Sequence, residues 1–464
     1  MLRLLAERDW LVLALFATLA SCTGSAQSLV APLPPLQRNP AAPLQRSPFA
    51  ASAYAPLASL PTPIQHVVII FQENRTPDYL FQGIPGADIA TTAKDWYGQV
   101  VPLRPISLAA GYDLGHGHDS FVKDYNNGNM DGFDYGLPDK IHLRPFGYAP
   151  PGEAQPYHDM AMQYVLADHM FQSNQGPSFP AHLYIVSGKA GDASIRPFVV
   201  SGNSYNSVTN RGVAAGCDAV PAAVVRTINP RNGNRGPTVF PCFDRVVLSD
   251  LLDAKGISWR YYQNVRGAGL WNAFDAIRHV RYGSDYANVR VPSTKILTAI
   301  KSGRLADVSW VMPGGPWSDH AGPHSTTRGP AWVAAIVNAI GESQYWNSTA
   351  IFVTWDDWGG WYDHVKPPID NFYELGFRVP LLVISPYARQ GYVSKVQHEF
   401  GSILAFTEET YGIPKGSLNT SDVRADDLRD AFDFTQKPRA FKPILSTPFA
   451  AVPDNGEEDA AESQ

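Results

Sequence analysis

Carboxylate and amide side chains follow two short apolar runs of the sequence. One run, residues 351–355, ends at two adjacent aspartates, and the other, residues 66–71, is followed by a glutamine, a glutamate and an asparagine. A short apolar run that stops at carboxylates predicts a buried strand that delivers acids to the sheet edge where α/β proteins bind ligands. Adjacent buried aspartates repel each other unless a cation relieves the repulsion, although an acidic turn is the alternative interpretation. The two stretches together predict one shared metal ion, with Glu73, Asn74, Asp356 and Asp357 as oxygen ligands.

Ser178 lies two residues before Pro180, in a position where a helix is expected to begin. Proline suits the first turn of a helix and serine suits its cap, so Ser178 should lie beside free helix amides and the positive end of the helix dipole. A phosphoryl group bound there would meet backbone donors. If the metal also touches the Ser178 oxygen, the serine becomes a nucleophile near neutral pH. A serine that only caps the helix is the alternative.

Histidines occur in two loops rich in glycine and proline, at positions 116 and 118 and at positions 320 and 324. Loops of this kind on a rigid sheet often carry function, although plain solvent exposure is the alternative for each histidine. A zinc site is disfavoured because no third nitrogen or sulfur ligand stands at zinc-like spacing. The predicted oxygen ligands favour a single hard divalent cation, Ca²⁺ or Mg²⁺ ahead of Zn²⁺.

Composition bounds the fold and the partners. The chain has 464 residues, 44% of them hydrophobic, which is ample for a large core. A net charge of -6 offers no basic field, so nucleic acid is excluded as a partner. Alternating strand and helix signals predict an α/β fold with a mostly parallel sheet that helices cover on both faces. Strands are expected at 66–71, 257–262, 308–312, 350–355 and 380–384, helices at 159–166, 179–187, 294–302, 330–342 and 399–411, and surface insertions at about 199–241 and 266–284.

The ends of the chain predict export. Residues 1–22 are typical of a lipoprotein signal peptide that would leave Cys22 lipidated as a membrane tether, and ordinary cleavage near Ala26 is the alternative. We expect a periplasmic or cell-envelope lipoprotein, otherwise a secreted protein. Cys217 and Cys242 would pair in a disulfide in that compartment, although two free thiols are also possible. The expected parts are a signal peptide at 1–22, a Pro/Ala-rich tether at 23–63, a catalytic domain at 64–415 and a polar tail at 416–464.

Four stretches in order, residues 66–75, 176–180, 319–320 and 356–365, together resemble the bacterial phosphoesterase family. That family contains phosphatidylcholine-type phospholipases C and related acid phosphatases, and the likeness runs from about residue 64 to 412. The resemblance implies an alkaline-phosphatase-like core and a nucleophile that is phosphorylated transiently. It implies Ser178 as the nucleophile and a fifth metal ligand. It also implies His116 and His320 as residues that face the phosphate and either stabilise its equatorial oxygens or protonate the leaving group. Asp363 and His364 match the family motif as supports of the loop.

Departures from the family pattern bear on the substrate. Many phospholipase-like members have Asp-Glu at positions 356 and 357, threonine at 178 and an aromatic residue at 118, and the haemolytic ones carry a long C-terminal extension. Asp357 and Ser178 favour an acid-phosphatase-like hydrolase of small phosphate esters, and the lack of the extension argues against a membrane-attacking enzyme. The alternative is a phospholipase C whose aromatic side chains box a choline headgroup, unless those side chains only pack. The candidates for this box are Trp96, Trp317, Trp358, Trp361 and Tyr362.

Two further classes remain open at this point. A surface protein could keep the metal only for stability, but nucleophile, ligands and both histidines are present together. Sulfatase chemistry would need an arginine in the motif that begins at Ser178, where the chain has His182.

Overall fold

The computed structural model describes residues 62–449. The predicted signal peptide, Cys22, most of the predicted tether and the acidic end of the chain lie outside these residues. Within residues 62–449, no helix is both long and apolar enough to span a bilayer.

An eight-stranded sheet forms the centre of the fold, in the order β13-β12-β14-β1-β15-β16-β6-β17. Strand β16 runs antiparallel to both neighbours, and the other pairs are parallel. The strands are β1 His66–Gln72, β6 Val165–Ala167, β12 Trp259–Tyr262, β13 Val289–Arg290, β14 Val308–Val311, β15 Thr349–Trp355, β16 Leu381–Ile384 and β17 Tyr392–Ser394. This arrangement confirms the predicted mostly parallel sheet.

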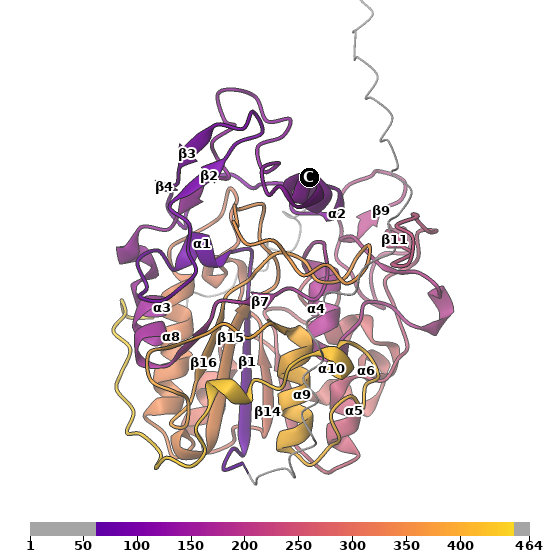
Figure 1. The fold of residues 1–464 in the computed structure, drawn as a ribbon. Helices are drawn as coiled ribbons and strands as arrows, with labels where there is room; N and C mark the ends of the chain where they lie inside the picture. The colour runs from indigo at the N-terminus through magenta and orange to yellow at the C-terminus, as the bar shows by residue number, and fades with distance from the viewer. Residues whose placement is uncertain (1–61, 450–464) are drawn as a thin grey trace, which may run out of the picture. The chain divides into compact units, whose positions relative to one another are not determined.

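Helices cover both faces of the sheet (Figure 1). Side chains alternate between the two faces of a strand. Phe71 of β1 contacts helices α4 and α9, whereas Trp355 of β15 contacts Tyr157 of α3 on the other face. The α-helices are α1 Pro77–Leu80, α2 His118–Tyr125, α3 Pro151–Gln163, α4 Ser178–Ser187, α5 Leu248–Asp253, α6 Arg278–Tyr282, α7 Lys295–Lys301, α8 Gly329–Gly341, α9 Phe400–Thr410 and α10 Ser421–Arg424.

The predicted elements agree with the structure except at one helix. The five predicted strands correspond to β1, β12, β14, β15 and β16, and four predicted helices correspond to α4, α7, α8 and α9. The helix predicted over 159–166 is wrong at both ends. It begins at Pro151, a residue suited to the first turn, and residues 165–167 form the buried strand β6.

Residues 92–148, which we call the cap, form a second layer of structure between α1 and α3. The cap contains β2 Thr92–Lys94, β3 Val100–Pro102, β4 Arg104–Pro105, α2 and β5 Gly147–Tyr148. It has its own hydrophobic cluster, which includes Phe121 and Phe133 and also takes in Trp358, Tyr362 and Phe377 from the main body. The cap is therefore packed onto the loop that follows β15.

The segment 199–241 forms two small antiparallel pairs, β8 Val199–Val200 with β11 Thr227–Ile228 and β9 Tyr205–Asn206 with β10 Ala223–Val224. The disulfide predicted between Cys217 and Cys242 is confirmed.

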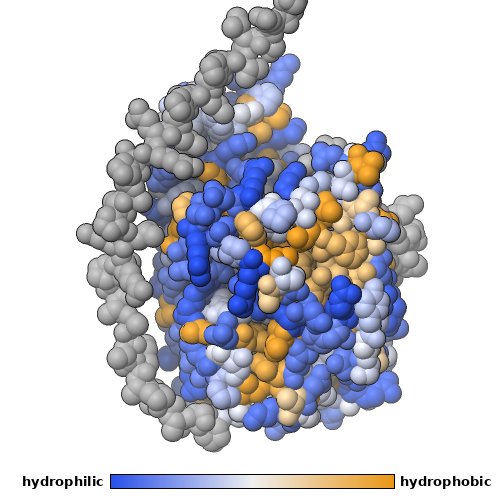
Figure 2. Space-filling view, turned by 90° about the vertical axis from the view of Figure 1, so that its right-hand side faces the viewer, coloured by the Kyte–Doolittle hydropathy of each residue, from blue (hydrophilic) through white to orange (hydrophobic). Residues whose placement is uncertain are grey.

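The side of the molecule that carries β9 and β11 shows apolar patches between hydrophilic ones (Figure 2).

Two expectations about peripheral segments need correction. Residues 266–284 are not a surface insertion, because Ala273, Phe274 and Ile277 are fully buried in the main core. Residues 416–449 are not a free polar tail, because Leu428 and Phe432 pack into that same core. Both segments lack a clear apolar period, and single apolar side chains are enough to anchor them.

Candidate active site

The parallel pairing of β1 with β15 brings the two acidic stretches together. Gln72 pairs with Trp355, so the residues that follow each strand are neighbours. The backbone N–H of Asn74 donates to Asp356 Oδ1 at 2.9 Å, and that of Asp357 donates to the same oxygen at 2.8 Å. One aspartate oxygen thus fixes both loops, and the other oxygen of Asp356 remains for a different partner.

The amide of Asn74 has a defined orientation. Its Nδ2 donates to Asp357 Oδ1 and to His116 Nε2, each at 3.2 Å. The remaining amide oxygen, Asn74 Oδ1, and the second oxygen of Asp356, Oδ2, are buried and accept no hydrogen bond within residues 62–449. Buried acceptors without a donor are costly, and a cation removes this cost. These two oxygens therefore fit a metal ion.

Gly359 allows the loop after β15 to close against Asn74. Its φ of +62° lies in the left-handed region, and a Cβ there would lie 2.5 Å from the Asn74 carbonyl oxygen. The Gly359 N–H donates to Asp357 Oδ1 at 2.7 Å. Asn74 itself has a φ of +61°, which asparagine tolerates better than most residues. Position 359 thus requires glycine, because the backbone of Asn74 lies too close for a side chain.

Ser178 is the first residue of α4, and not its cap as predicted, because Pro177 occupies the cap position. Its Oγ donates to Glu73 Oε2 at 3.3 Å. The N–H of Phe179, the next helix amide, donates to Asn203 Oδ1 at 2.9 Å. The serine hydroxyl therefore points to the acidic site. The Phe179 amide, which the helix itself leaves unpaired, is satisfied by the Asn203 side chain.

His182 joins the site although the sequence did not single it out as a ligand. It lies four residues after Ser178, so both side chains lie on one face of α4. Its Nε2 is 2.9 Å from Glu73 Oε1, and Glu73, His182 and Asp356 offer ligand atoms within 4.8 Å of one another. The spacing of four residues in the helix was the signal that could have identified it.

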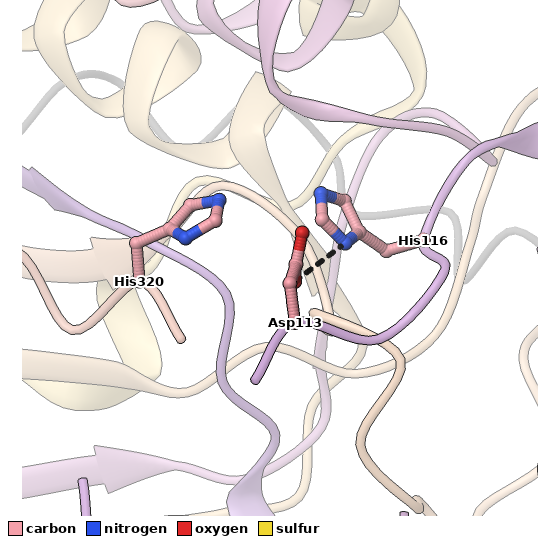
Figure 3. Close-up of side chains that lie close together, drawn as sticks. All are labelled: Asp113, His116 and His320. Carbon is pink, nitrogen blue, oxygen red and sulfur yellow. Dashed lines mark ion pairs between the residues drawn. The ribbon is translucent and has the colours of Figure 1, made fainter. Parts of the chain in front are cut away.

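Two of the predicted histidines face each other across the site (Figure 3). The rings of His116 and His320 have centroids 5.8 Å apart. His116 Nδ1 lies 2.7 Å from the Leu114 carbonyl and 3.6 Å from Asp113 Oδ1, and His320 Nδ1 lies 2.5 Å from the Ala321 carbonyl. If each Nδ1 donates to its carbonyl, each Nε2 is an acceptor. This tautomer of His116 matches the hydrogen bond from Asn74.

His118 lies elsewhere. Its Nδ1 is 2.8 Å from the Gln175 carbonyl and its ring packs against Tyr373 at 5.3 Å. Burial lowers the pKa of His118 below its usual value. The side chain thus links the cap to the loop before Ser178.

Buried polar side chains around Asp319 hold the loop that carries His320. Asp319 Oδ2 accepts hydrogen bonds from Tyr157 at 2.7 Å and from Trp355 at 3.0 Å, and burial raises its pKa to about 6. The Asp319 N–H donates to Gln72 Oε1 at 3.2 Å, which ties this loop to the end of β1. These bonds fix the position of the loop that carries His320.

Asp363 and His364 bind other charged groups. Asp363 pairs with the buried Arg378 at 2.9 Å, and His364 lies 2.8 Å from Asp78 and 3.0 Å from Asp88. Burial lowers the pKa of His364, but the hydrogen bond and charge of Asp78 raise it overall to about 9. The network joins the loop after β15 to α1 and to the segment between α1 and the cap.

Four of the five aromatic side chains considered for a choline box are buried in packing. Trp358 contacts Phe121 and Phe377, and Trp361 contacts Tyr79. Trp317, Trp358, Trp361 and Tyr362 are all less than 9% exposed, whereas Trp96 is 40% exposed. The packing alternative therefore describes these four side chains.

All seven predicted site residues lie in one connected group. Contacts join Ser178 to Glu73, and Asn74 to Asp356, Asp357 and His116, while His320 faces His116. The donors are mainly oxygen atoms, with one imidazole nitrogen from His182. Such a set suits a divalent cation.

Comparison with known proteins agrees with this geometry. The profile of the Phosphoesterase family matches residues 64–414. Phospholipase C B of Mycobacterium tuberculosis (strain CDC 1551 / Oshkosh) is 27% identical over 454 residues, covering 83% of this chain and 81% of that enzyme. Non-hemolytic phospholipase C of Pseudomonas aeruginosa is 24% identical, covering 86% of this chain and 60% of that enzyme. Non-specific phospholipase C1 of Arabidopsis thaliana is 26% identical over 228 residues, 42% of each chain.

Among solved structures, a protein in the alkaline phosphatase superfamily from Vibrio parahaemolyticus matches with a TM-score of 0.37 and 12% identity. The match covers 79% of this chain and 71% of that one.

Proposed function

We propose, for a chain that belongs to the phosphoesterase family and is thus a hydrolase of phosphoric ester bonds, that Ser178 is its nucleophile and that phospholipid phosphodiesters are its substrates. The observation that carries the proposal is the contact between Ser178 Oγ and Glu73 at 3.3 Å. It sets a helix-start hydroxyl against a buried group of carboxylates. An isolated serine cap would have no such partner.

The proposed chemistry consists of two displacements at phosphorus. Ser178 Oγ attacks, the bond from phosphorus to the leaving oxygen breaks, and Glu73 accepts the hydroxyl hydrogen. Water then attacks the phosphoserine and the bond from phosphorus to Ser178 Oγ breaks. Glu73 returns the hydrogen to Ser178 Oγ, and the water gives up a hydrogen to the histidine that protonated the leaving alcohol. Positioning and charge neutralisation dominate in phosphoryl transfer, and a cation supplies that neutralisation when bound. The residues that would hold it are Glu73, Asn74, Ser178, Asp356 and Asp357, with His182 as an added candidate.

The two histidines receive different roles in this proposal. His116 Nε2 accepts a hydrogen bond from Asn74 at 3.2 Å and so holds the amide oxygen in its ligand orientation. The His320 ring faces His116 across the site, with the two ring centroids 5.8 Å apart, and His320 is not among the residues assigned to the cation (Figure 3). We therefore assign protonation of the leaving alcohol to His320, which in its doubly protonated form keeps the Nδ1 bond to Ala321 and donates the hydrogen on Nε2. Its bond to the Ala321 carbonyl keeps the ring in place.

The substrate assignment departs from the acid-phosphatase-like expectation. Chain length does not separate a phosphatase from a phospholipase C, because the match with the similar phospholipase C B covers 81% of that enzyme. A phosphomonoesterase remains the second candidate, favoured by serine at 178 and aspartate at 357. Ca²⁺ or Mg²⁺ remains the preferred cation over Zn²⁺, since most of the donors are oxygen atoms.

Export is also part of the proposal. The disulfide Cys217–Cys242 suits an oxidising compartment. The signal-like residues 1–22 would direct the chain there, with Cys22 as a lipid-modified tether or with cleavage near Ala26 and secretion.

The test compares three substrates on the purified full chain: monomeric short-chain phosphatidylcholine, p-nitrophenyl phosphorylcholine and p-nitrophenyl phosphate. We expect the two diesters to be hydrolysed faster than the monoester. Ser178→Ala should abolish turnover of all three without changing the melting temperature. Retained activity in Ser178→Ala would remove the nucleophile, and preference for the monoester would favour the phosphatase.

A further inference from the structure

We infer that the outer face of the β2–β3 hairpin docks on an anionic phospholipid surface. The inference rests on the proposed phospholipid substrate, because docking would bring the site to a membrane. We call residues 92–104 the cap hairpin. It lies at the same end of the molecule as α1, the helix that follows β1 (Figure 1).

The two faces of the cap hairpin differ in chemistry. Strands β2 and β3 pair antiparallel, with Lys94 opposite Val100 and Ala93 opposite Val101. Ala93 is buried in the cap cluster, and Val101 packs against it. Lys94 and Val100 point to the other side and are exposed, Val100 at 68%. The outward face therefore combines an apolar and a basic side chain.

The turn of the cap hairpin presents two aromatic side chains. Trp96 is 40% exposed and Tyr97 is 69% exposed. The buried Asp95 accepts hydrogen bonds from the N–H groups of Tyr97 and Gln99 at 3.0 Å and 2.7 Å, and the Trp96 N–H donates to Asp134 Oδ1 at 2.8 Å. The turn is thus fixed by its own hydrogen bonds. Tryptophan and tyrosine favour the headgroup level of a bilayer, because each has an apolar body and a polar tip.

The exposed charges of the cap hairpin are positive. Lys94 and Arg104 are exposed, whereas Asp95, the acidic residue of the hairpin, is 3% exposed and bound to the turn. This local sign opposes the net charge of -6 of the whole chain. Basic side chains beside interfacial aromatic ones complement anionic lipid headgroups. Positive charge alone would suit a second copy of this acidic chain equally well, but the exposed Trp96 and Tyr97 beside these charges favour a lipid surface.

The cap hairpin packs against the loop that carries part of the site. Ala93 and Leu103 belong to the same hydrophobic cluster as Trp358, which follows Asp357 directly. The cap also carries His116. Docking of the hairpin would therefore hold the site at a fixed distance from the lipid surface, with no separate domain needed.

The experiment measures binding to vesicles of phosphatidylglycerol and phosphatidylcholine by cosedimentation. Full-length Ser178→Ala is the background, so that binding needs no turnover. We expect the double change Lys94→Ala/Arg104→Ala to weaken binding to the anionic vesicles about thirtyfold. The protein with an unchanged hairpin should lose the same factor of binding when the salt concentration is raised. Trp96→Ser/Tyr97→Ser should weaken binding to both anionic and neutral vesicles. Val100→Ser should weaken binding, whereas the matched Val246→Ser, at a valine 54% exposed outside the cap, should not.

The controls separate this inference from the proposed function. In the active enzyme, the hairpin variants should hydrolyse the soluble monomeric substrate at the wild-type rate, which also shows that they fold. Wild-type vesicle binding by Trp96→Ser/Tyr97→Ser would overturn the docking surface while leaving the function intact. A dimer in light scattering that these changes abolish would identify a second copy as the occupant and would also overturn it. If vesicle binding behaves as expected but no phospholipid is hydrolysed, the proposed function fails and the docking surface stands.

Discussion

At the scale of single residues, the site depends on which oxygen atoms lack donors. Asn74 Nδ2 donates hydrogen bonds to Asp357 and His116, and these bonds fix the direction of the amide oxygen. The sequence predicted that these residues would meet, because each follows a strand. It could not predict the orientation of the amide, which depends on how the cap places His116, or the contact of His182 with Glu73, which depends on the packing of α4 against β1.

The different roles proposed for the histidines predict different defects. His320→Gln should lower kcat about 10²–10⁴-fold for substrates with an alcohol leaving group, because that alcohol needs a proton. It should have little effect with p-nitrophenol, which leaves without one. Steady-state kinetics with both leaving groups measures this difference.

His116→Gln should instead weaken metal affinity about 10–100-fold, as loss of a bond to a metal ligand does elsewhere. Added Ca²⁺ or Mg²⁺ should then restore kcat. The reverse result, a leaving-group effect in His116→Gln and metal rescue in His320→Gln, would exchange the two roles.

At the scale of elements, apolar runs were reliable guides and short buried pieces were not. Strands β1 and β15 are clear from the sequence because each contains an unbroken apolar run, residues 67–71 in β1 and residues 350–353 in β15. Strand β6 has only three residues, and its apolar side chains were merged with the preceding helix. The sequence predicts a surface insertion at 266–284 because the buried residues there include a short 3-10 turn, Ala273–Ala276, which has no apolar period to detect.

That misread segment holds a buried acid with a testable pH effect. Burial raises the pKa of Asp275 to about 7, although hydrogen bonds from Tyr286 and Gln263 lower it. A folded-state pKa above the unfolded value means that the folded state binds more protons between pH 4 and 7. Stability is therefore present at low pH and lost as pH rises to about 7, by about 4 kcal/mol.

Asp275→Asn should remove this loss while keeping an acceptor for Tyr286. Urea unfolding of the wild type and the variant across pH 4–8 measures the difference in slope. Parallel curves for the two proteins would show that Asp275 does not carry the effect.

At the scale of the whole molecule, the site joins parts that are distant in sequence. Glu73 and Asn74 follow β1, Asp356 and Asp357 follow β15, Ser178 begins α4, and His116 comes from the cap. The four ordered motifs therefore predicted which residues meet at the ends of β1 and β15, and their catalytic roles stay a prediction. They could not predict the cap hairpin, whose exposed aromatic and basic residues belong to no site motif.

Because the ligands come from distant elements, cation binding should stabilise the fold as a whole. A ligand that binds only the folded state at 100 times its Kd adds about 2.7 kcal/mol to the free energy of unfolding. Removal of the metal with EDTA should therefore lower both the melting temperature and phosphodiester turnover. Added Ca²⁺ or Mg²⁺ should restore both, and the metal content can be followed by elemental analysis.

Asp356→Asn provides the matched control for metal removal. It keeps the oxygen that accepts from Asn74 and Asp357 but replaces the oxygen that has no donor, so it should lower metal content most directly. In this variant, EDTA should produce a smaller fall in melting temperature than in the wild type. An equal fall in both proteins would place the stabilising cation away from the ends of β1 and β15.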